Sequence, residues 1–224
     1  MSYLSVDIES AGLAVDHHSV LSLGAIIDDF QTPIDELPEF RCLIDNETIT
    51  ANKYALGMHV DSGLLKELED PDDDTLVLNP EEVAPAFKLW MVRNGIDHDG
   101  EEFGKGKYGK AYPVGAGKNL ASFDIPHLQT LPGWEDHIQF HHRVLDPGPL
   151  YFDPLEDEKP PNLQTCMERA DFEDTDTAHT SVEDARDVIK LLRHAYGYHS
   201  ENGGAVAERK PNLPFEKRLF KGFS

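Results

Sequence analysis

The chain has 224 residues, of which 39% are apolar and 28% are charged, a composition typical of a soluble globular protein with one sizeable hydrophobic core. Its 20 lysines and arginines stand against 42 aspartates and glutamates, which gives a formal net charge of -22 at pH 7. This balance excludes a uniformly basic surface that coats nucleic acid, so any polyanionic ligand must be held locally. No segment approaches the roughly 18 apolar residues that span a bilayer, and the N-terminus lacks the features of a signal peptide. We therefore expect a cytoplasmic protein with no membrane partner.

Apolar runs open the chain and predict a meander of three strands: Tyr3–Ile8, Ser19–Ile27 and Phe40–Ile44. The acidic stretch Glu67–Asp74 predicts a solvated loop. Helix and strand signals then alternate, with a helix from Asn79–Pro80 to Gly95, a strand at Ala111–Ala116, a helix over Phe123–Leu131, a strand at His142–Asp146, and helices over Asn162–Ala170 and Ser181–Tyr196. This order predicts an α/β fold with a mixed sheet, in one domain over residues 1–200, followed by a C-terminal tail over residues 201–224.

Two carboxylates fall inside the first predicted strand. Because side chains alternate along a strand, Asp7 and Glu9 share one face, with Ile8 between them on the other. Two acids on one face of a central strand are costly unless a cation neutralises them. The pair therefore indicates a metal site, although an acid pair at this spacing also occurs by chance.

Further acids stand where helices begin. Asp124 follows a predicted strand, and Asp184 lies in the first turns of the last helix, five residues after His179. Taken singly, each acid is explained equally well as a helix-start residue that favours the helix dipole.

Taken in order, Asp7, Glu9, Asp124, His179 and Asp184 resemble the DEDDh group of 3′-to-5′ exonucleases in the ribonuclease H-like superfamily. That group includes ribonuclease T, oligoribonuclease and polymerase proofreading domains. The first block, Asp7-Ile8-Glu9-Ser10-Ala11-Gly12-Leu13, is similar to the family's Asp-x-Glu-Thr-Thr-Gly-Leu, and the resemblance spans roughly Tyr3 to Leu192. It implies a ribonuclease H-like mixed sheet of about five strands with helices on both faces.

The resemblance also implies a mechanism. Asp7, Glu9, Asp124 and Asp184 would hold two divalent ions, Mg²⁺ or Mn²⁺, and His179 would act as the general base. Ser10 would border the 3′-hydroxyl through its backbone, and Leu13 would pack against the terminal base. The expected activity is 3′-to-5′ hydrolysis of phosphodiester bonds at the 3′ end of single-stranded DNA, RNA or a short oligonucleotide, with release of nucleoside 5′-monophosphates. Members of this family are often dimers, so a homodimer is one expected state.

Several residues stay outside the predicted site. The middle block of the family carries an asparagine where this chain has Leu120, and Asn119 lies one position earlier, so Asn119 is left out. Asp146 and Asp187 are undecided between a place beside the metals and solvated positions. The doublets His17-His18 and His141-His142 lack acids at ligand spacing, and Cys42 and Cys166 are expected to be buried free thiols.

A different class of function fits the same residues. The chain could be a catalytically silent ribonuclease H-like binding module, or an acidic protein whose surface imitates nucleic acid. Retention of every expected site residue argues against the silent module. The absence of polymerase or helicase segments favours a stand-alone trimming enzyme, and the acidic surface predicts binding limited to a chain end.

Overall fold

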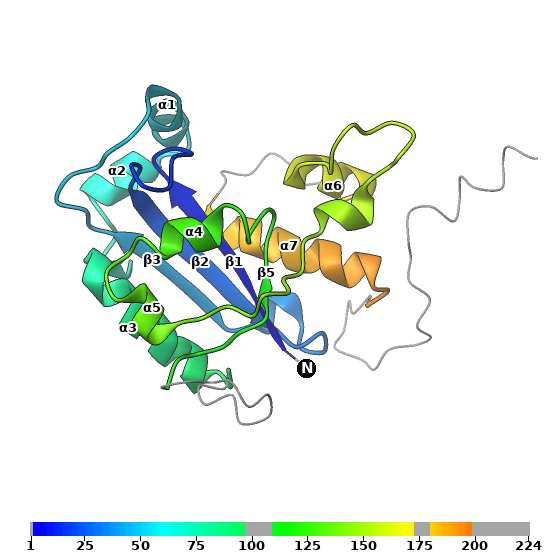
Figure 1. Cartoon of the computed structure of the whole chain (residues 1–224), viewed down its shortest axis with the longest axis horizontal. Coiled ribbons are helices and arrows are strands. Elements are labelled where there is room, and N and C mark those ends of the chain that lie inside the picture. Colours follow the sequence, from blue (N-terminus) through cyan, green and yellow to red (C-terminus); the bar gives the residue numbers. More distant parts are fainter. Residues whose placement is uncertain (1, 97–108, 173–179, 199–224) are drawn as a thin grey trace, which may run out of the picture.

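The computed structural model describes residues 2–96, 109–172 and 180–198. They form a five-stranded sheet in the order β4-β3-β2-β1-β5 (Figure 1). The strands are β1 (Tyr3–Ser10), β2 (Val20–Asp28), β3 (Glu39–Ile44), β4 (Val77–Leu78) and β5 (Gly115–Ala116). The first three pair antiparallel, which confirms the predicted meander, whereas β4 and β5 join the two edges in parallel.

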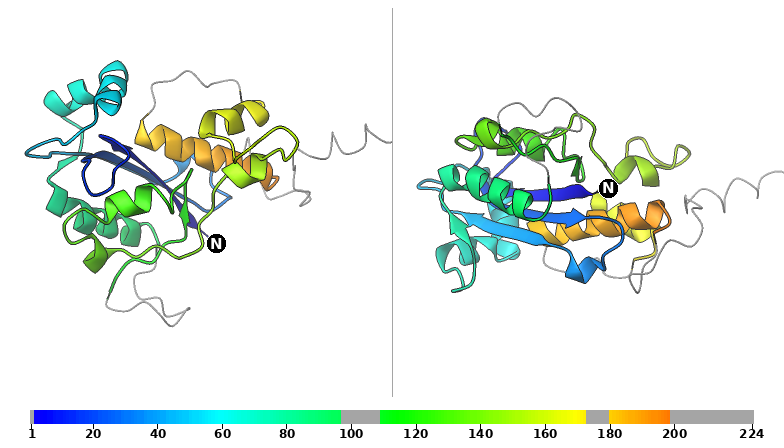
Figure 2. Two further views of the ribbon diagram at one scale, coloured as in Figure 1. Left: turned by 45° about the horizontal axis from the view of Figure 1, so that its top comes forward. Right: turned by 90° about the horizontal axis from the view of Figure 1, so that it is seen from below.

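Helices cover both faces of this sheet (Figures 1 and 2). They are α1 (Lys53–Asp61), α2 (Leu64–Glu69), α3 (Pro80–Arg93), α4 (Asp124–Leu128), α5 (Trp134–His137), α6 (Leu163–Arg169) and α7 (Ser181–Ala195), with 3-10 turns η1 (Ile34–Glu36) and η2 (Gly148–Tyr151). Figure 2 shows α7 on one face and α3, α4 and α5 on the other. The predicted α/β fold with a mixed sheet is therefore confirmed.

Side chains alternate between the two faces of β1, so each face contacts a different group of helices. Leu4, Val6 and Ile8 are buried in the core on the side of α3, α4 and α5. Tyr3 packs with the apolar residues of α7, and the Ser5 hydroxyl donates to the carbonyl of Ala185 in α7 at 2.8 Å. Because alternate residues share a face, the side of β1 that carries the two acids is the side that α7 covers.

A buried ion pair ties the end of α7 to the sheet. The Arg193 guanidinium binds the Asp28 carboxylate at the end of β2, and their side chains are only 4% and 0% exposed. The same carboxylate accepts a hydrogen bond from the Tyr3 hydroxyl at 2.6 Å. Charges this deeply buried need partners on every side, so the cluster holds α7, β1 and β2 in one arrangement.

Several predicted elements differ from the observed ones. The strand expected at 111–116 is reduced to β5 plus a single bridge from Ala111 to Ile138, and the strand expected at 142–146 is reduced to a bridge at Leu145. The helix expected over 123–131 ends at Leu128. The acidic stretch is not entirely a loop, because Glu67 lies in α2 and binds Arg41 through two hydrogen bonds of 2.7 and 2.6 Å.

Other expectations are met or lie outside the described residues. Cys42 and Cys166 are buried free thiols, as predicted. In the described part of the chain, no helix has the length and apolar character that a bilayer crossing requires. The proposed tail over residues 201–224 falls outside the described ranges.

Candidate metal centre

The site lies where the sheet contacts the first turn of α7, beside Asp7 of β1. Asp7 pairs with Gly24 of β2, and α7 lies directly against that glycine. A Cβ atom at Gly24 would stand 2.3 Å from the backbone carbon of Ser181 and from the nitrogen of Val182. Only glycine allows this approach, and the approach brings the first turn of α7 next to Asp7.

This approach gathers three carboxylates. One oxygen from each of Asp7, Glu9 and Asp184 lies within 4.8 Å of the other two, and all three side chains are partly buried. Thr180 caps the helix that carries Asp184, because its side chain accepts a hydrogen bond from the Glu183 backbone nitrogen. This cap begins α7 at the place where Asp184 faces the strand.

Asp124 reaches the same strand from its open edge. The Leu4 nitrogen donates to Val114 beside β5, so the nitrogens of alternate residues along β1 point to this edge. Beyond Ser5, β5 has ended, and the Ile8 nitrogen donates instead to the Asp124 carboxylate at 3.2 Å. Asp124 is 2% exposed and opens α4. The short β5 therefore leaves room for a fourth carboxylate at the edge of β1.

Burial and mutual repulsion shift the pKa values of these acids. Burial raises the pKa of Asp7 well above its usual value, and the charges of Asp124, Asp184 and Glu9 raise it further. Burial, with the charges of Asp184 and Asp124, raises the pKa of Glu9 to about 8. Burial also raises the pKa of Asp124 to about 7, against the backbone hydrogen bonds that lower it. Four carboxylates in this arrangement repel one another unless cations neutralise them.

The residues fit divalent cations. Carboxylate oxygens are the hard ligands that Mg²⁺ and Mn²⁺ prefer. Within the described ranges, the trio of Asp7, Glu9 and Asp184 is the one group of three or more such side chains close enough to hold a metal ion. Asp124 adds a further carboxylate through its contact with β1.

The remaining predicted site residues have different outcomes. The Ser10 hydroxyl donates to the Gly12 carbonyl at 3.0 Å and so helps to shape the loop after β1. Leu13 lies in that loop with 79% of its surface exposed, available for contact. His179 lies outside the described residues, immediately before the helix cap Thr180.

Two buried histidines that the sequence analysis missed support this loop. His59 of α1 is 4% exposed, its Nε2 lies 2.8 Å from the Ser10 carbonyl oxygen, and its Nδ1 lies 3.9 Å from the Glu9 carboxylate. His127 of α4 is fully buried and links the Phe123 and Gly12 carbonyl oxygens at 2.9 and 3.3 Å. Both histidines connect helices to the chain that leaves β1, and neither stands in a recognisable sequence motif.

The undecided residues take structural positions. The Asp146 carboxylate accepts hydrogen bonds from the backbone nitrogens of Asn119 at 3.0 Å and Gly148 at 2.7 Å, and its charge contributes to the raised pKa of Asp124. Asp146 therefore lies near the site and holds the turn at Asn119, where φ is +62°. Asp187 instead pairs with Lys190 at 2.7 Å.

Comparison with solved structures identifies the architecture. The *Neurospora crassa* Pan2 catalytic unit, with its protease and nuclease domain, matches 85% of this chain with a TM-score of 0.51 and 16% identity. The *Saccharomyces cerevisiae* Pan2 pseudoubiquitin hydrolase–RNA exonuclease module, solved with AAGGA RNA, matches 88% with a TM-score of 0.53 and 14% identity. *Escherichia coli* ExoI, solved with single-stranded DNA and a zinc ion, matches 86% with a TM-score of 0.51 and 13% identity. The fold is ribonuclease H-like.

The ribonuclease H-like fold is shared at low sequence identity. No protein-family model and no curated protein sequence matches the chain. The chain corresponds to 26% and 28% of the two Pan2 chains and to 40% of ExoI. The resemblance in three dimensions therefore concerns one module of each larger protein.

Proposed function

We propose that the protein is a metal-dependent 3′-to-5′ exonuclease of the DEDDh type. It hydrolyses phosphodiester bonds at the 3′ end of single-stranded DNA or RNA and releases nucleoside 5′-monophosphates. The observation that carries this proposal is the convergence of four carboxylates, from β1, α4 and α7, on one site of a ribonuclease H-like fold.

The predicted site residues have different roles in the proposed reaction. Asp7, Glu9, Asp124 and Asp184 would hold two divalent ions, which would supply activation of the attacking water and stabilisation of negative charge on oxygen. His179 accepts the proton of the attacking water, a task suited to an imidazole with an ordinary pKa of about 6.5. The backbone of Ser10 borders the 3′-hydroxyl, and the exposed Leu13 packs against the terminal base.

The net charge of the chain and its structural neighbours both support the proposed substrate class. The Pan2 module was solved with RNA and ExoI with single-stranded DNA, so both sugars are reasonable substrates. The net charge of -22 disfavours tight binding along a duplex, whereas bound divalent ions reverse the sign locally. Binding is therefore limited to a chain end presented to the metal site. Tight, metal-independent binding to long duplexes would contradict this.

The test is a shortening assay on two strands of matched sequence. Single-stranded DNA and RNA carrying a 5′ label are incubated with the full chain in Mg²⁺ or Mn²⁺, beside Asp7→Ala and His179→Ala variants. We expect a ladder that shortens from the 3′ end, only with metal, and that both variants suppress. The preferred sugar is read from the same gel.

The outcomes separate this proposal from its alternative. If neither strand is shortened with either metal, the protein is no exonuclease, and a silent binding module or nucleic-acid mimic becomes the better explanation. Shortening that persists in Asp7→Ala would show that the activity comes from a contaminant.

A further inference from the structure

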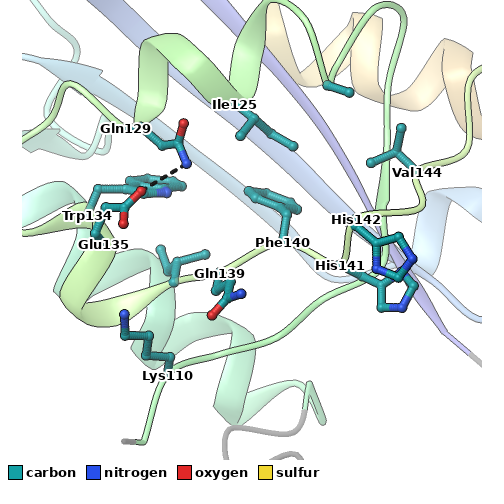
Figure 3. A pocket seen from close by; sticks show the side chains of 12 residues that line it. Lys110, Ile125, Gln129, Trp134, Glu135, Gln139, Phe140, His141, His142 and Val144 are labelled. Carbon is teal, nitrogen blue, oxygen red and sulfur yellow. Dashed lines mark hydrogen bonds between the residues drawn. The ribbon is translucent and has the colours of Figure 1, made fainter. Parts of the chain in front are cut away.

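A pocket separate from the carboxylate site lies between α4, α5 and residues 138–144 (Figure 3). We call it the α4–α5 pocket. Its volume is about 410 Å³, within the range of small-ligand sites. None of the four clustered acids lines it, and it lies with α4 and α5 on the face of the sheet away from α7.

The apolar residues that line this pocket are held in place by the hydrophobic core. Trp134 and Ile138 belong to the main hydrophobic core, and Ile125, Phe140 and Val144 pack against that core while still facing the pocket. Figure 3 shows Phe140 between Ile125 and the histidines. The aromatic and aliphatic side chains on this part of the lining suit contact with a flat group.

The rim supplies hydrogen-bonding groups on two sides. The Gln129 amide nitrogen donates to the Glu135 carboxylate at 3.0 Å, which leaves the Gln129 carbonyl oxygen as an acceptor. Gln139, also at the rim, is exposed and carries both a donor and an acceptor. These groups match the edge of a heterocycle that alternates donors and acceptors.

Paired aromatic rings form the opposite side of the rim. The rings of His141 and His142 lie 4.3 Å apart between centroids, and Tyr112 meets His141 edge-on at 5.7 Å. The Arg143 backbone nitrogen donates to His141 Nδ1 at 3.0 Å, which holds that ring in place.

The charges of the lining exclude other ligand classes. Lys110 is its one lysine or arginine and Glu135 its one acid, so the two formal charges cancel and a free phosphate gains little. A metal ion is disfavoured as well, since in the described part of the chain the clusters able to hold one consist of Asp7, Glu9 and Asp184 alone. A neutral, planar ligand with a polar edge remains.

We propose that the α4–α5 pocket binds a nucleobase. Phe140 and His141 offer ring faces for stacking, and Gln129 and Gln139 bind the edge of the base. The source of the base rests on the proposed function: it belongs either to a nucleotide of the single-stranded substrate upstream of the cleaved end or to a released nucleotide.

Fluorine NMR with 5-fluorotryptophan tests the pocket directly. The chain has two tryptophans; Trp134 lines the pocket and Trp90 does not, so Trp90 is an internal control. The metal-free full chain is titrated with adenosine, uridine, adenosine 5′-monophosphate, ribose 5-phosphate and hexaadenylate. We expect every probe with a base to shift the Trp134 signal more than that of Trp90, and ribose 5-phosphate to shift neither. Tighter binding of hexaadenylate than of adenosine identifies the chain as the source, and equal binding identifies the free nucleotide.

Matched variants complete the test. Gln139→Ala combined with His141→Ala should weaken adenosine binding by roughly tenfold, the usual effect of losing one hydrogen bond and part of a stacking surface. Gln164→Ala combined with His17→Ala, which changes exposed residues elsewhere, should leave it unaltered. The proposal is overturned if nucleosides leave Trp134 unshifted, if ribose 5-phosphate shifts it equally, or if both double variants behave alike.

A separate arm distinguishes failure of the pocket from failure of the enzyme. Asp7→Asn should abolish hydrolysis of a dinucleotide in Mn²⁺ while leaving the Trp134 titration intact. Absent hydrolysis with an intact titration counts against the exonuclease alone, and absent titration with intact hydrolysis counts against the pocket alone.

Discussion

Asp184 and Asp187 lie one turn apart on α7, yet their surroundings differ. Asp184 faces Asp7 and Glu9, with ligand oxygens within 4.8 Å of one another. Asp187 accepts a hydrogen bond from Lys190 at 2.7 Å on the same helix. The two acids therefore form a matched pair, one inside the carboxylate site and one outside it.

We predict that Asp184→Asn strongly lowers the turnover number and that Asp187→Asn does not. Asp184→Asn should lower the turnover number by about 100-fold or more, because losing a metal ligand costs more than the 10–100-fold typical of an outer partner. Asp187→Asn should keep about the parent rate. Turnover on single-stranded DNA or RNA in saturating Mn²⁺ measures both. Equal losses would show that the two acids share one role and would contradict the proposed ligand set.

For single residues, the order of the acids along the chain was a better guide to the site than the local sequence around each acid. The resemblance to the DEDDh exonucleases implied one site for Asp7, Glu9, Asp124 and Asp184, and the structure brings these side chains together. His59 could not be found in this way, since its contact with Ser10 joins residues 49 positions apart and belongs to no motif. The role of His179 stays a prediction.

Among the elements, the contact between α7 and β2 decides whether the site forms. Gly24 allows the backbone of Ser181 and Val182 to touch the sheet beside Asp7. By contrast, Gly57 in α1 has open space where a Cβ atom would stand. The same change from glycine to alanine therefore has opposite expected effects at the two positions.

Gly24→Ala should destabilise the fold by about 1–3 kcal/mol, the usual cost of overpacking, and weaken Mn²⁺ binding because it pushes Asp184 away from Asp7. Gly57→Ala should stabilise α1 by up to about 1 kcal/mol and leave Mn²⁺ binding unchanged. Urea unfolding and calorimetric titration with Mn²⁺ measure the two effects. Parent-like Mn²⁺ affinity in a folded Gly24→Ala protein would show that this contact does not position Asp184.

The sequence did not predict α1, and this omission has a physical cause. In α1 the exposed positions include Tyr54, Met58 and Val60, while Ala55 and His59 are buried. This reversal removes the apolar stripe that marks an amphipathic helix. Near Leu145 the error is the opposite one, because the sequence predicted a strand and the observed pairing is a single bridge to Ala116. By contrast, β1, β2, α3 and α7 carry clear apolar patterns and were predicted.

For the molecule as a whole, the clustered acids couple metal binding to stability. Asp7, Glu9 and Asp124 have raised pKa values in the folded chain, with Glu9 at about 8 and Asp124 at about 7. Unfolded aspartates and glutamates titrate near 3.9 and 4.3, so the folded chain binds more protons between these limits. The stabilisation from protonation is thus fully present below about pH 4 and is lost as pH rises through about 8.

We therefore expect the melting temperature of the metal-free protein to fall as pH rises from about 6 to 8.5. Asp7→Asn should flatten this dependence, because it removes one of the repelling charges. Mn²⁺ at about 100 times its dissociation constant should restore about 2.7 kcal/mol at high pH. Thermal unfolding in chelator and in Mn²⁺ gives both curves. A melting temperature in chelator that is flat or rises over this range, with Asp7→Asn parallel to it, would contradict the electrostatic account.

The placement of the acids along the chain also bears on when the carboxylate cluster can form during synthesis. A ribosome produces β1 first and α7 last among the described elements, and Asp184 reaches Asp7 only when the first turn of α7 settles on Gly24. A nascent chain that stops before this turn carries Asp7 and Glu9 without the third acid of their cluster and without the helix that covers them. Assembly of the carboxylate cluster therefore requires synthesis at least through the first turn of α7, and chains that stop earlier lack the cluster.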